Sequence, residues 1–162
     1  MAFLFESFDG WKQYCDLHHM SLSEVVLEYE QTQKGSGEAE IRSGLMAAWQ
    51  VMKNAVNTGL EEDMTSRSGM INNGAKKVYR YPTPVLSREF QNLIARALAA
   101  KEVNSCMGRI VAAPTAGASG IMPGVLYTLQ EIHQIKDEKI IDAMLIAAGI
   151  ALIMEQKASI SG

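Results

Sequence analysis

The sequence predicts an all-α protein: a helical domain fragment with a long irregular loop and a glycine-rich loop between helices. Two observations lead to this class. Apolar residues recur at spacings of three and four over several long stretches, which is the period of an amphipathic helix. No stretch alternates apolar and polar residues over enough positions to require a strand, and the run IVAA at 110–113 is too short to decide alone.

The first two expected helices flank a glycine- and serine-containing break, KGSGEAE, at 34–40. The first begins at Ser21, because Ser-Leu-Ser-Glu is a capping-box pattern, and runs towards Lys34. The second starts near Glu38 and is expected to end at Gly59. One face of this second helix carries Leu45, Trp49, Met52 and Val56.

Residues 61–84 lack sustained periodicity and hold two glycines and two prolines, which predicts an irregular loop with room for a short turn of helix. Beyond Pro84 an apolar face predicts a helix that extends to about Asn104. That face consists of Phe90, Leu93, Ile94, Ala97 and Leu98. Two more helices are expected at 125–135 and 138–156, joined by a short turn.

Length and composition favour a single globular unit, because 162 residues amount to about one domain and 48% of them are apolar. Fifteen basic and eighteen acidic residues give a net charge of -3 without a basic block, so no nucleic-acid partner is expected. The N-terminus lacks the features of a signal peptide, and a cytoplasmic location is expected. The apolar run 140–154 is shorter than the roughly 20 residues that a bilayer requires and contains Asp142, so it predicts a buried helix and no membrane span.

The cysteines and histidines form no metal-ligand or catalytic pattern. Cys15 and Cys106 are far apart in the sequence and are expected to be reduced and buried. His18 and His19 are adjacent, so on a helix they point about 100° apart and cannot chelate one ion together; a helix end is expected there. His133 lies on a polar face and is expected to be solvated.

The stretch GRIVAAPTAGASGIMPGVL at 108–126 is the strongest candidate for a ligand site. Its interior glycines are Gly117, Gly120 and Gly124. They permit close backbone approaches, while Thr115 and Ser119 add hydroxyls, so such a turn is suited to a carboxylate or a phosphate. The spacing GxxGxxxG matches neither a Walker loop nor a dinucleotide fingerprint. The residues alone leave two alternatives open: a ligand-binding loop, or a helix connector packed under its neighbours.

A second candidate is Arg67 in TSRSGM at 65–70, which lies among three hydroxyls. A guanidinium grips a carboxylate through two parallel hydrogen bonds, which is one way to fix an amino-acid substrate. The alternative is a solvated loop arginine beside a Ser-Gly turn.

Several segments together resemble the α chain of the bacterial iron-sulfur-dependent L-serine dehydratases. The block GRIVAAPTAGASGIMPGVL, preceded by KEVNSCM and followed after the apolar helix by ASISG, carries most of the resemblance, and MSLSEVVLEYE, AAWQVMKNAVNTGLE and TSRSGM also fit. The resemblance spans nearly all 162 residues but only the front portion of the family's α chain. The chain departs from the family at Lys157, where Asn is common, at INNG in place of a Thr-Gly-Gly turn, and in the length of 75–85.

The resemblance implies an enzyme that converts L-serine into pyruvate and ammonia with the help of a [4Fe-4S] cluster. One iron of that cluster lacks a protein ligand and acts on the substrate hydroxyl as a Lewis acid, while a base removes the Cα proton. In the family the cluster cysteines follow the equivalent of ASISG, and neither Cys15 nor Cys106 matches them. The cluster ligands are therefore absent from this chain, and a separate β chain is an implied partner.

The resemblance also implies site residues. Thr115 matches a position that contacts substrate, and Arg67 lies where the family places basic or polar residues near the carboxylate. Ser119, Gly117 and Gly120 belong to the same substrate loop as Thr115, and no residue of this chain is identified as the catalytic base. The alternative hypothesis is a cluster-free helical domain that binds a small carboxylate or a partner subunit without catalysis.

Overall fold

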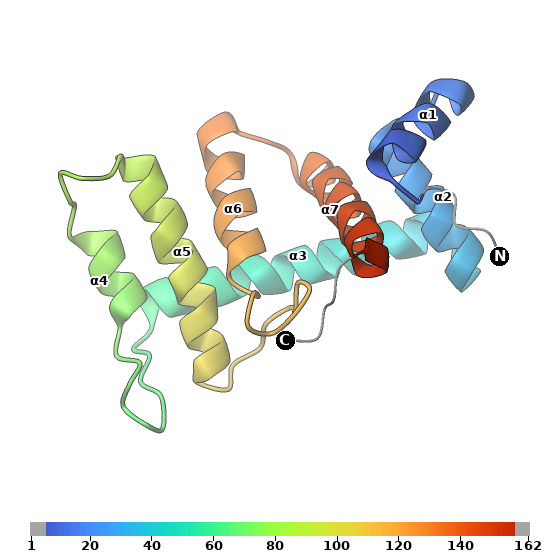
Figure 1. Cartoon of the computed structure of the whole chain (residues 1–162). Helices are drawn as coiled ribbons and strands as arrows, with labels where there is room; N and C mark the ends of the chain where they lie inside the picture. The colour runs from blue at the N-terminus through green and yellow to red at the C-terminus, as the bar shows by residue number, and fades with distance from the viewer. Residues whose placement is uncertain (1–5, 158–162) are drawn as a thin grey trace. The chain divides into compact units, whose positions relative to one another are not determined.

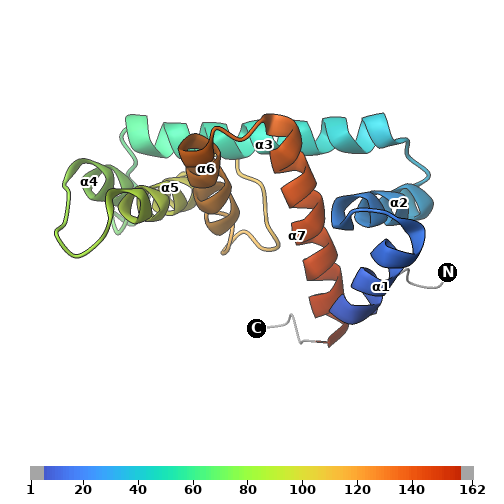
Figure 2. The ribbon, with the colours of Figure 1, turned by 90° about the horizontal axis from the view of Figure 1, so that it is seen from above.

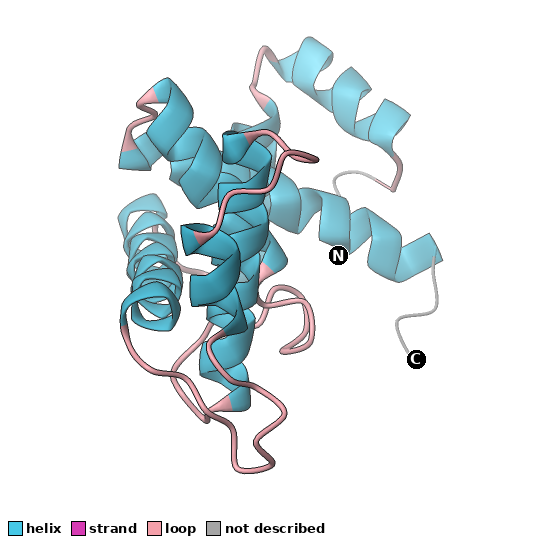
Figure 3. Cartoon of the chain, turned by 90° about the vertical axis from the view of Figure 1, so that its left-hand side faces the viewer, coloured by secondary structure: helices cyan, strands magenta, loops and turns pink. Residues whose placement is uncertain are grey.

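The computed structural model describes residues 6–157; the ASISG segment at 158–162 lies outside the described residues. Within residues 6–157 the chain forms seven helices and no strand (Figures 1 and 3), which confirms the predicted all-α class. The helices are α1 Phe8–His18, α2 Leu22–Lys34, α3 Glu38–Glu61, α4 Gly74–Arg80, α5 Arg88–Ser105, α6 Ile121–His133 and α7 Asp137–Lys157.

The described residues group into two compact units. The first unit contains the residues up to Met46 together with those from Asp137 onwards. The second unit is the continuous segment Ala47–Lys136. Helix α3 contributes its first residues to the first unit and its remaining turns to the second.

Helix α2 of the first unit begins at the capping box that the sequence predicted. Ser21 Oγ accepts a hydrogen bond from the Glu24 amide at 3.3 Å, and Glu24 Oε2 accepts one from the Ser21 amide at 2.7 Å. The helix ends at Gly35, which adopts the left-handed conformation with φ +67°. These contacts satisfy backbone groups that a helix end otherwise leaves unpaired.

The core of the first unit lies where α1 and α7 pack on α2. Its buried members are Trp11, Val25, Val26, Leu27, Leu145 and Ile153. Gly149 of α7 makes this packing possible, because a Cβ at this position would lie 2.5 Å from the Trp11 ring. Helix α1 was not predicted from the sequence, but the helix end predicted at the histidine pair is confirmed: α1 ends at His18, and His19 is left-handed with φ 54°.

The acidic residue inside the apolar helix α7 is paired. Asp142 accepts hydrogen bonds from Arg42 at 3.0 Å and from Lys139 at 3.1 Å. Among the described residues, α7 included, none of the helices has the length and apolarity that crossing a membrane requires.

In the second unit α4, α5 and α6 stand side by side across α3 (Figures 1 and 2). Gly59 was expected to end the preceding helix, and this prediction was wrong, because α3 continues to Glu61. A Cβ at Gly59 would lie 2.4 Å from the carbonyl oxygen of Ala99, so this glycine serves the close approach of α3 to α5. A core cluster forms beside this contact from Ala55, Val56, Met64, Ala100 and Val103.

The remaining helix boundaries lie near the predicted ones. The region 61–84, expected to be irregular, contains the short helix α4. Helix α5 begins after Ser87, whose Oγ accepts a hydrogen bond from the Phe90 amide at 3.3 Å. Helix α6 begins at Ile121, four residues before the predicted start, because Pro123 fits in the first turn of a helix, where amides lack intrahelical partners.

Candidate functional site

The glycine-rich loop leaves the C-terminal end of α5 through a tight reversal. Met107 is exposed and left-handed with φ 64°, and the Gly108 amide donates a hydrogen bond to the Val103 carbonyl at 2.8 Å. A Cβ at Gly108 would lie 2.5 Å from Val103 Cγ1. The glycine that opens the sequence motif therefore sets the direction in which the loop leaves the helix.

The middle of the loop is a turn from Thr115 to Ala118. The Ala118 amide lies 3.2 Å from both Thr115 Oγ1 and the Thr115 carbonyl oxygen. Ser119 Oγ donates to the Ala116 carbonyl at 2.7 Å. The turn is thus fixed by its own hydroxyl groups, a common use of Ser and Thr in turns.

Two side chains from the last turns of α5 hold the same turn from outside. Lys101 Nζ donates to the Gly117 carbonyl at 3.2 Å, and Asn104 Nδ2 donates to the Ala116 carbonyl at 3.3 Å. The amides of Ala116 and Gly117 make no hydrogen bond with any residue in the described range 6–157. The carbonyls of this turn are therefore occupied, whereas its two central amides are available.

The second half of the loop is packed against α5. A Cβ at Gly120 would lie 2.1 Å from the Ala97 carbonyl oxygen, and a Cβ at Gly124 would lie 2.9 Å from Ala97 Cβ. Ser119 is buried, with its hydroxyl committed to the Ala116 carbonyl. In this half the loop acts as the tightly packed connector that the sequence left open as one alternative.

Thr115 and Gly117 differ from Ser119 and Gly120 because they are exposed. A Cβ at Gly117 would meet only Thr115 Oγ1, at an ordinary 3.6 Å. Thr115 Oγ1 acts as an acceptor for Ala118, and its hydroxyl proton has no acceptor among the described residues. The exposed half of the loop therefore offers one hydroxyl and two amides as hydrogen-bond donors.

The loop before α4 is ordered by its own serines and presents Arg67 to solvent. The Gly69 amide donates to the Ser66 carbonyl at 2.9 Å, and Gly69 has a φ of +71°, a conformation that favours glycine. Ser66 Oγ also accepts from the Ile71 amide at 3.1 Å. Arg67 makes no hydrogen bond or ion pair with a described residue.

Both loops lie at the end of the second unit where α4 and α6 begin and α5 ends (Figure 1). Glu102 links α5 to α4 at this end. Its Oε1 accepts a hydrogen bond at 3.1 Å from the Ala75 amide, in the first turn of α4. Glu102 lies between Lys101 and Asn104 on α5. The helix that anchors the Thr115 turn thus also anchors the segment that follows the Arg67 loop.

Lys101 and Asn104 position the loop, although neither is among the site residues predicted from the sequence. The sequence contains an indication of this role, because two hydrogen-bond donors spaced three apart lie on one face of a helix, immediately before the glycine-rich stretch. Their target carbonyls at 116 and 117 depend on how the loop folds back, which the spacing does not reveal.

Among residues 6–157, no group of three or more His, Cys, Asp or Glu side chains is arranged to hold a metal ion. Cys15 lies in the first unit and Cys106 in the second, and both are free and half-buried, less buried than expected. His133 is exposed, as predicted. The described residues therefore do not fit an iron-sulfur cluster.

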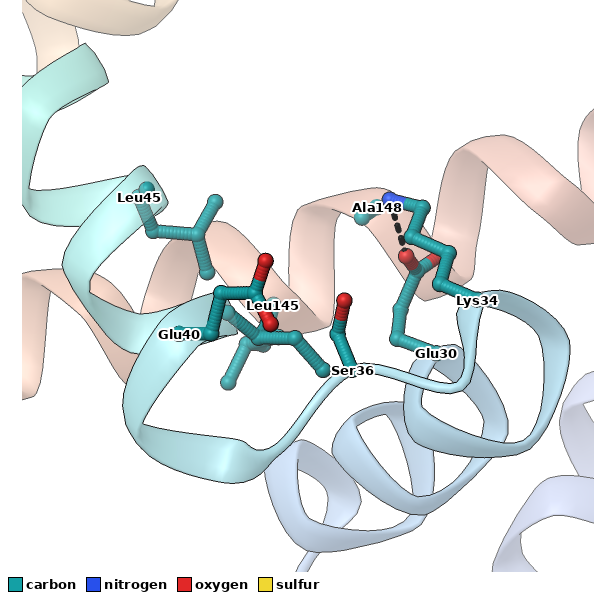
Figure 4. Close-up of a pocket in the computed structure, with 9 residues that line it drawn as sticks. Glu30, Lys34, Ser36, Glu40, Leu45, Leu145 and Ala148 are labelled. Atoms are coloured by element: carbon teal, nitrogen blue, oxygen red, sulfur yellow. Dashed lines mark ion pairs between the residues drawn. The ribbon is translucent and has the colours of Figure 1, made fainter.

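A separate hollow of about 370 Å³ lies in the first unit between α2, the start of α3 and α7 (Figure 4). Its floor is apolar, with Leu45 and Leu145, and on its rim Glu30 is paired with Lys34. None of the site residues predicted from the sequence lines this hollow.

The fold and the loop together define a class: an all-α protein with an exposed turn of hydroxyl and amide donors held at the junction of two antiparallel helices. The family model for the serine dehydratase alpha chain matches residues 17–162. The chain belongs to the serine dehydratase alpha chain family.

Individual relatives agree with this assignment. The chain is 32% identical over 151 residues to an L-serine dehydratase alpha chain of Peptoniphilus asaccharolyticus, which covers 91% of this chain and 52% of the relative. It is 31% identical over 144 residues to a probable L-serine dehydratase alpha chain of Bacillus subtilis, covering 87% of this chain and 48% of the relative. It is 35% identical over 150 residues to an L-serine dehydratase of Streptomyces coelicolor, covering 88% of this chain and 32% of the relative.

The chain therefore spans about half the length of its alpha-chain relatives and about a third of the longer one. No solved structure matches it.

Proposed function

We propose that this chain forms the part of an L-serine dehydratase that receives the carboxylate of L-serine, in an enzyme that converts L-serine into pyruvate and ammonia. Membership of the family supports the reaction, since the relatives named above are L-serine dehydratases or their alpha chains. The observation that carries the site is the exposed Thr115 hydroxyl next to two amides, of Ala116 and Gly117, that lack partners among the described residues.

These donors suit an anion. Hydrogen bonds to a charged acceptor are about twice as strong as neutral ones, and backbone amides arranged in a turn form a concavity for oxyanions. The turn also precedes α6, whose N-terminal end carries a partial positive charge that falls off within about one turn. A carboxylate held in this way fixes the orientation of the neighbouring Cα-H and C-OH bonds, which an elimination requires.

Arg67 is the second proposed contact to the carboxylate. Its guanidinium is exposed, and no described residue occupies its donors, so a bidentate pair with a carboxylate would complete its hydrogen bonding. Gly117 contributes its amide and leaves space above the turn. Ser119 and Gly120 act in this proposal through the shape of the loop, since the first fixes the Ala116 carbonyl and the second packs on α5.

The complete protein would contain more than this chain. The [4Fe-4S] cluster that the resemblance implies would be held by residues outside it, because the described ones supply no ligand set. A β chain is the proposed partner, in keeping with relatives that are named alpha chains. The catalytic base is assigned to no residue of this chain.

The test compares this chain with a longer α chain that continues past Gly162 and is combined with its β chain. Iron and sulfide content and pyruvate release from L-serine are measured for both. The longer complex is expected to contain iron and sulfide and to release pyruvate, while this chain alone does neither. A complex that deaminates serine without iron would show that the iron-sulfur part of the proposal is wrong.

The second candidate is a non-catalytic role, because the hydroxyl and amide donors of the Thr115 turn all belong to this chain and suit an anion by themselves. A complex that releases no pyruvate, although this chain binds L-serine by calorimetry in a manner that Thr115→Ala abolishes, would favour a carboxylate-binding domain.

A further inference from the structure

The second unit contains a polar cavity away from the Thr115 turn. It measures about 500 Å³, within the roughly 300–1,000 Å³ typical of small-molecule pockets. The residues that line it belong to the last turns of α3, the end of α4, the middle of α5 and the C-terminal half of α6. The residues around it that carry charge or hydrogen-bonding groups are Asn57, Glu61, Tyr79, Arg80, Arg96, Tyr127 and Glu131.

A buried arginine forms part of the cavity wall. The Arg96 side chain is 4% exposed, and its guanidinium lies 4.6 Å from the centre of the Tyr127 ring. It donates to Thr128 Oγ1 at 3.0 Å and to Glu131 Oε2 at 2.7 Å. A guanidinium has five N–H donors, so three of those of Arg96 have no partner among the described residues.

Burial of an arginine costs free energy unless its charge and its donors are satisfied. The Glu131 carboxylate that pairs with Arg96 is itself 59% exposed, so solvent weakens this pair. Tyr127 donates to Asn57 Oδ1 at 3.2 Å, which leaves the amide nitrogen of Asn57 as a further donor at the same wall. This wall therefore combines a positive charge with unused hydrogen-bond donors. A ligand carboxylate would supply both the opposite charge and the acceptors.

The rim of the cavity carries one exposed group of each charge. Arg80 and Glu61 are both exposed, and neither makes a hydrogen bond with another residue in 6–157. The four charged residues of the lining are two arginines and two glutamates, so their charges cancel. A simple anion would be repelled by the glutamates and a simple cation by the arginines, whereas a ligand with both charges would match the lining.

We propose that this cavity binds a small zwitterion of the α-amino acid type. Its carboxylate would be held by Arg96 and Arg80, and its ammonium group by Glu61. Thr115 and Arg67, the proposed substrate contacts, are not among the residues that line this cavity, so this site would be an additional one, suited to an effector. It does not depend on the proposed dehydratase activity.

The test uses L-serine as the probe and measures its dissociation constant for the purified chain by calorimetry. Wild type is expected to bind, and Arg80→Gln and Glu61→Gln are each expected to weaken binding about tenfold or more, since each removes a charge-assisted hydrogen bond. Both positions are exposed, so the fold should persist, which circular dichroism checks. Lys136→Gln, an exposed charge removal outside the cavity lining, is the matched control and should bind as wild type does.

Two further measurements separate this proposal from its rivals. Thr115→Ala should bind L-serine in the cavity unchanged; loss of binding in Thr115→Ala alone, with Arg80→Gln unaffected, would overturn the inference and place the serine in the glycine-rich loop. Pyruvate and ethanolamine carry only one of the two charges and should each bind at least about tenfold more weakly than L-serine. No binding by wild type, or pyruvate binding as tightly as L-serine, would overturn the zwitterion site.

Discussion

Gly120 and Ala97 approach each other so closely that no other residue fits at position 120. A Cβ there would lie 2.1 Å from the main-chain carbonyl oxygen of Ala97. Because a helix carbonyl cannot swing away as a side chain does, the two helices would have to separate. This contact holds the start of α6 against α5 and, with it, the base of the Thr115 turn.

Gly120→Ala is therefore expected to destabilise the fold by about 1–3 kcal/mol, the usual cost of forcing extra volume into a packed contact. Urea unfolding followed by circular dichroism measures it. Gly117→Ala is the matched control, because a Cβ there meets only Thr115 Oγ1 at 3.6 Å. Equal stabilities of the two variants would contradict the assignment of Gly120 to packing and Gly117 to the exposed half of the loop.

Glu102 and Gly74 are expected to be energetically coupled. Glu102→Ala leaves the buried Ala75 amide without its acceptor, which costs about 1–3 kcal/mol. Gly74→Ala would place a Cβ 2.8 Å from Glu102 Oε1 and displace that oxygen from the amide. In the Glu102→Ala background this clash is absent, so Gly74→Ala should cost less there than in wild type. A double-mutant cycle by urea unfolding measures the coupling, and strictly additive effects would refute it.

Asp142 should make the stability of the first unit depend on pH. Burial acts to raise the pKa of this carboxyl, but hydrogen bonds from Lys139 and Arg42 outweigh it, and the pKa lies below its ordinary value. A folded-state pKa below the unfolded one means that the carboxylate stabilises the fold above about pH 3.9, the usual unfolded value, and that this contribution is lost as the pH falls through the folded value.

Asp142→Asn should accordingly lower the melting temperature at pH 7, and the difference from wild type should shrink at about pH 3, which lies below the unfolded pKa. Glu155→Gln removes a carboxylate that is exposed in the same helix and serves as the control. A difference for Asp142→Asn that persists undiminished at low pH would show that the ion pairs contribute no charge-dependent stability.

Thr115 and Arg67 should affect serine use in the complete enzyme. Thr115→Ala and Arg67→Ala each remove a donor proposed to hold the carboxylate, so kcat/KM for L-serine should fall about tenfold or more. Thr115→Ser keeps the hydroxyl and should retain most activity. The absorption of the iron-sulfur cluster should be the same in all variants, which separates a loss of substrate contact from a loss of cofactor. Unchanged kinetics in both alanine variants would remove these residues from the site.

The positions of most helices followed from the sequence because they depend on near neighbours. The capping box at Ser21 and the cap at Gly35 act within a few residues, and the period of three to four in α3 and α5 is a local property. The absence of a cap signal as clear as that of Ser21 explains why α1 was missed.

The buried faces were less predictable. Phe90 belongs to the apolar face that the sequence marked on α5, yet it is 51% exposed, whereas the small residues Ala95 and Ala99 are buried. Which face of a helix is covered depends on what packs against it, and the close approach at Ala99 is made possible by Gly59 of a different helix.

For the candidate site, the sequence determined the chemistry of the loop: its glycines, its two hydroxyls and its resemblance to a family to which the chain belongs. Only the tertiary structure decided which of these residues are exposed: Thr115 and Gly117 are exposed, whereas Ser119 and Gly120 are buried against α5. Likewise, only the packing of four helices brought Arg80, Arg96 and Glu61 around one cavity. The physical reason is common to both: side-chain chemistry is carried by each residue, whereas burial and close approach are made between segments far apart in the chain.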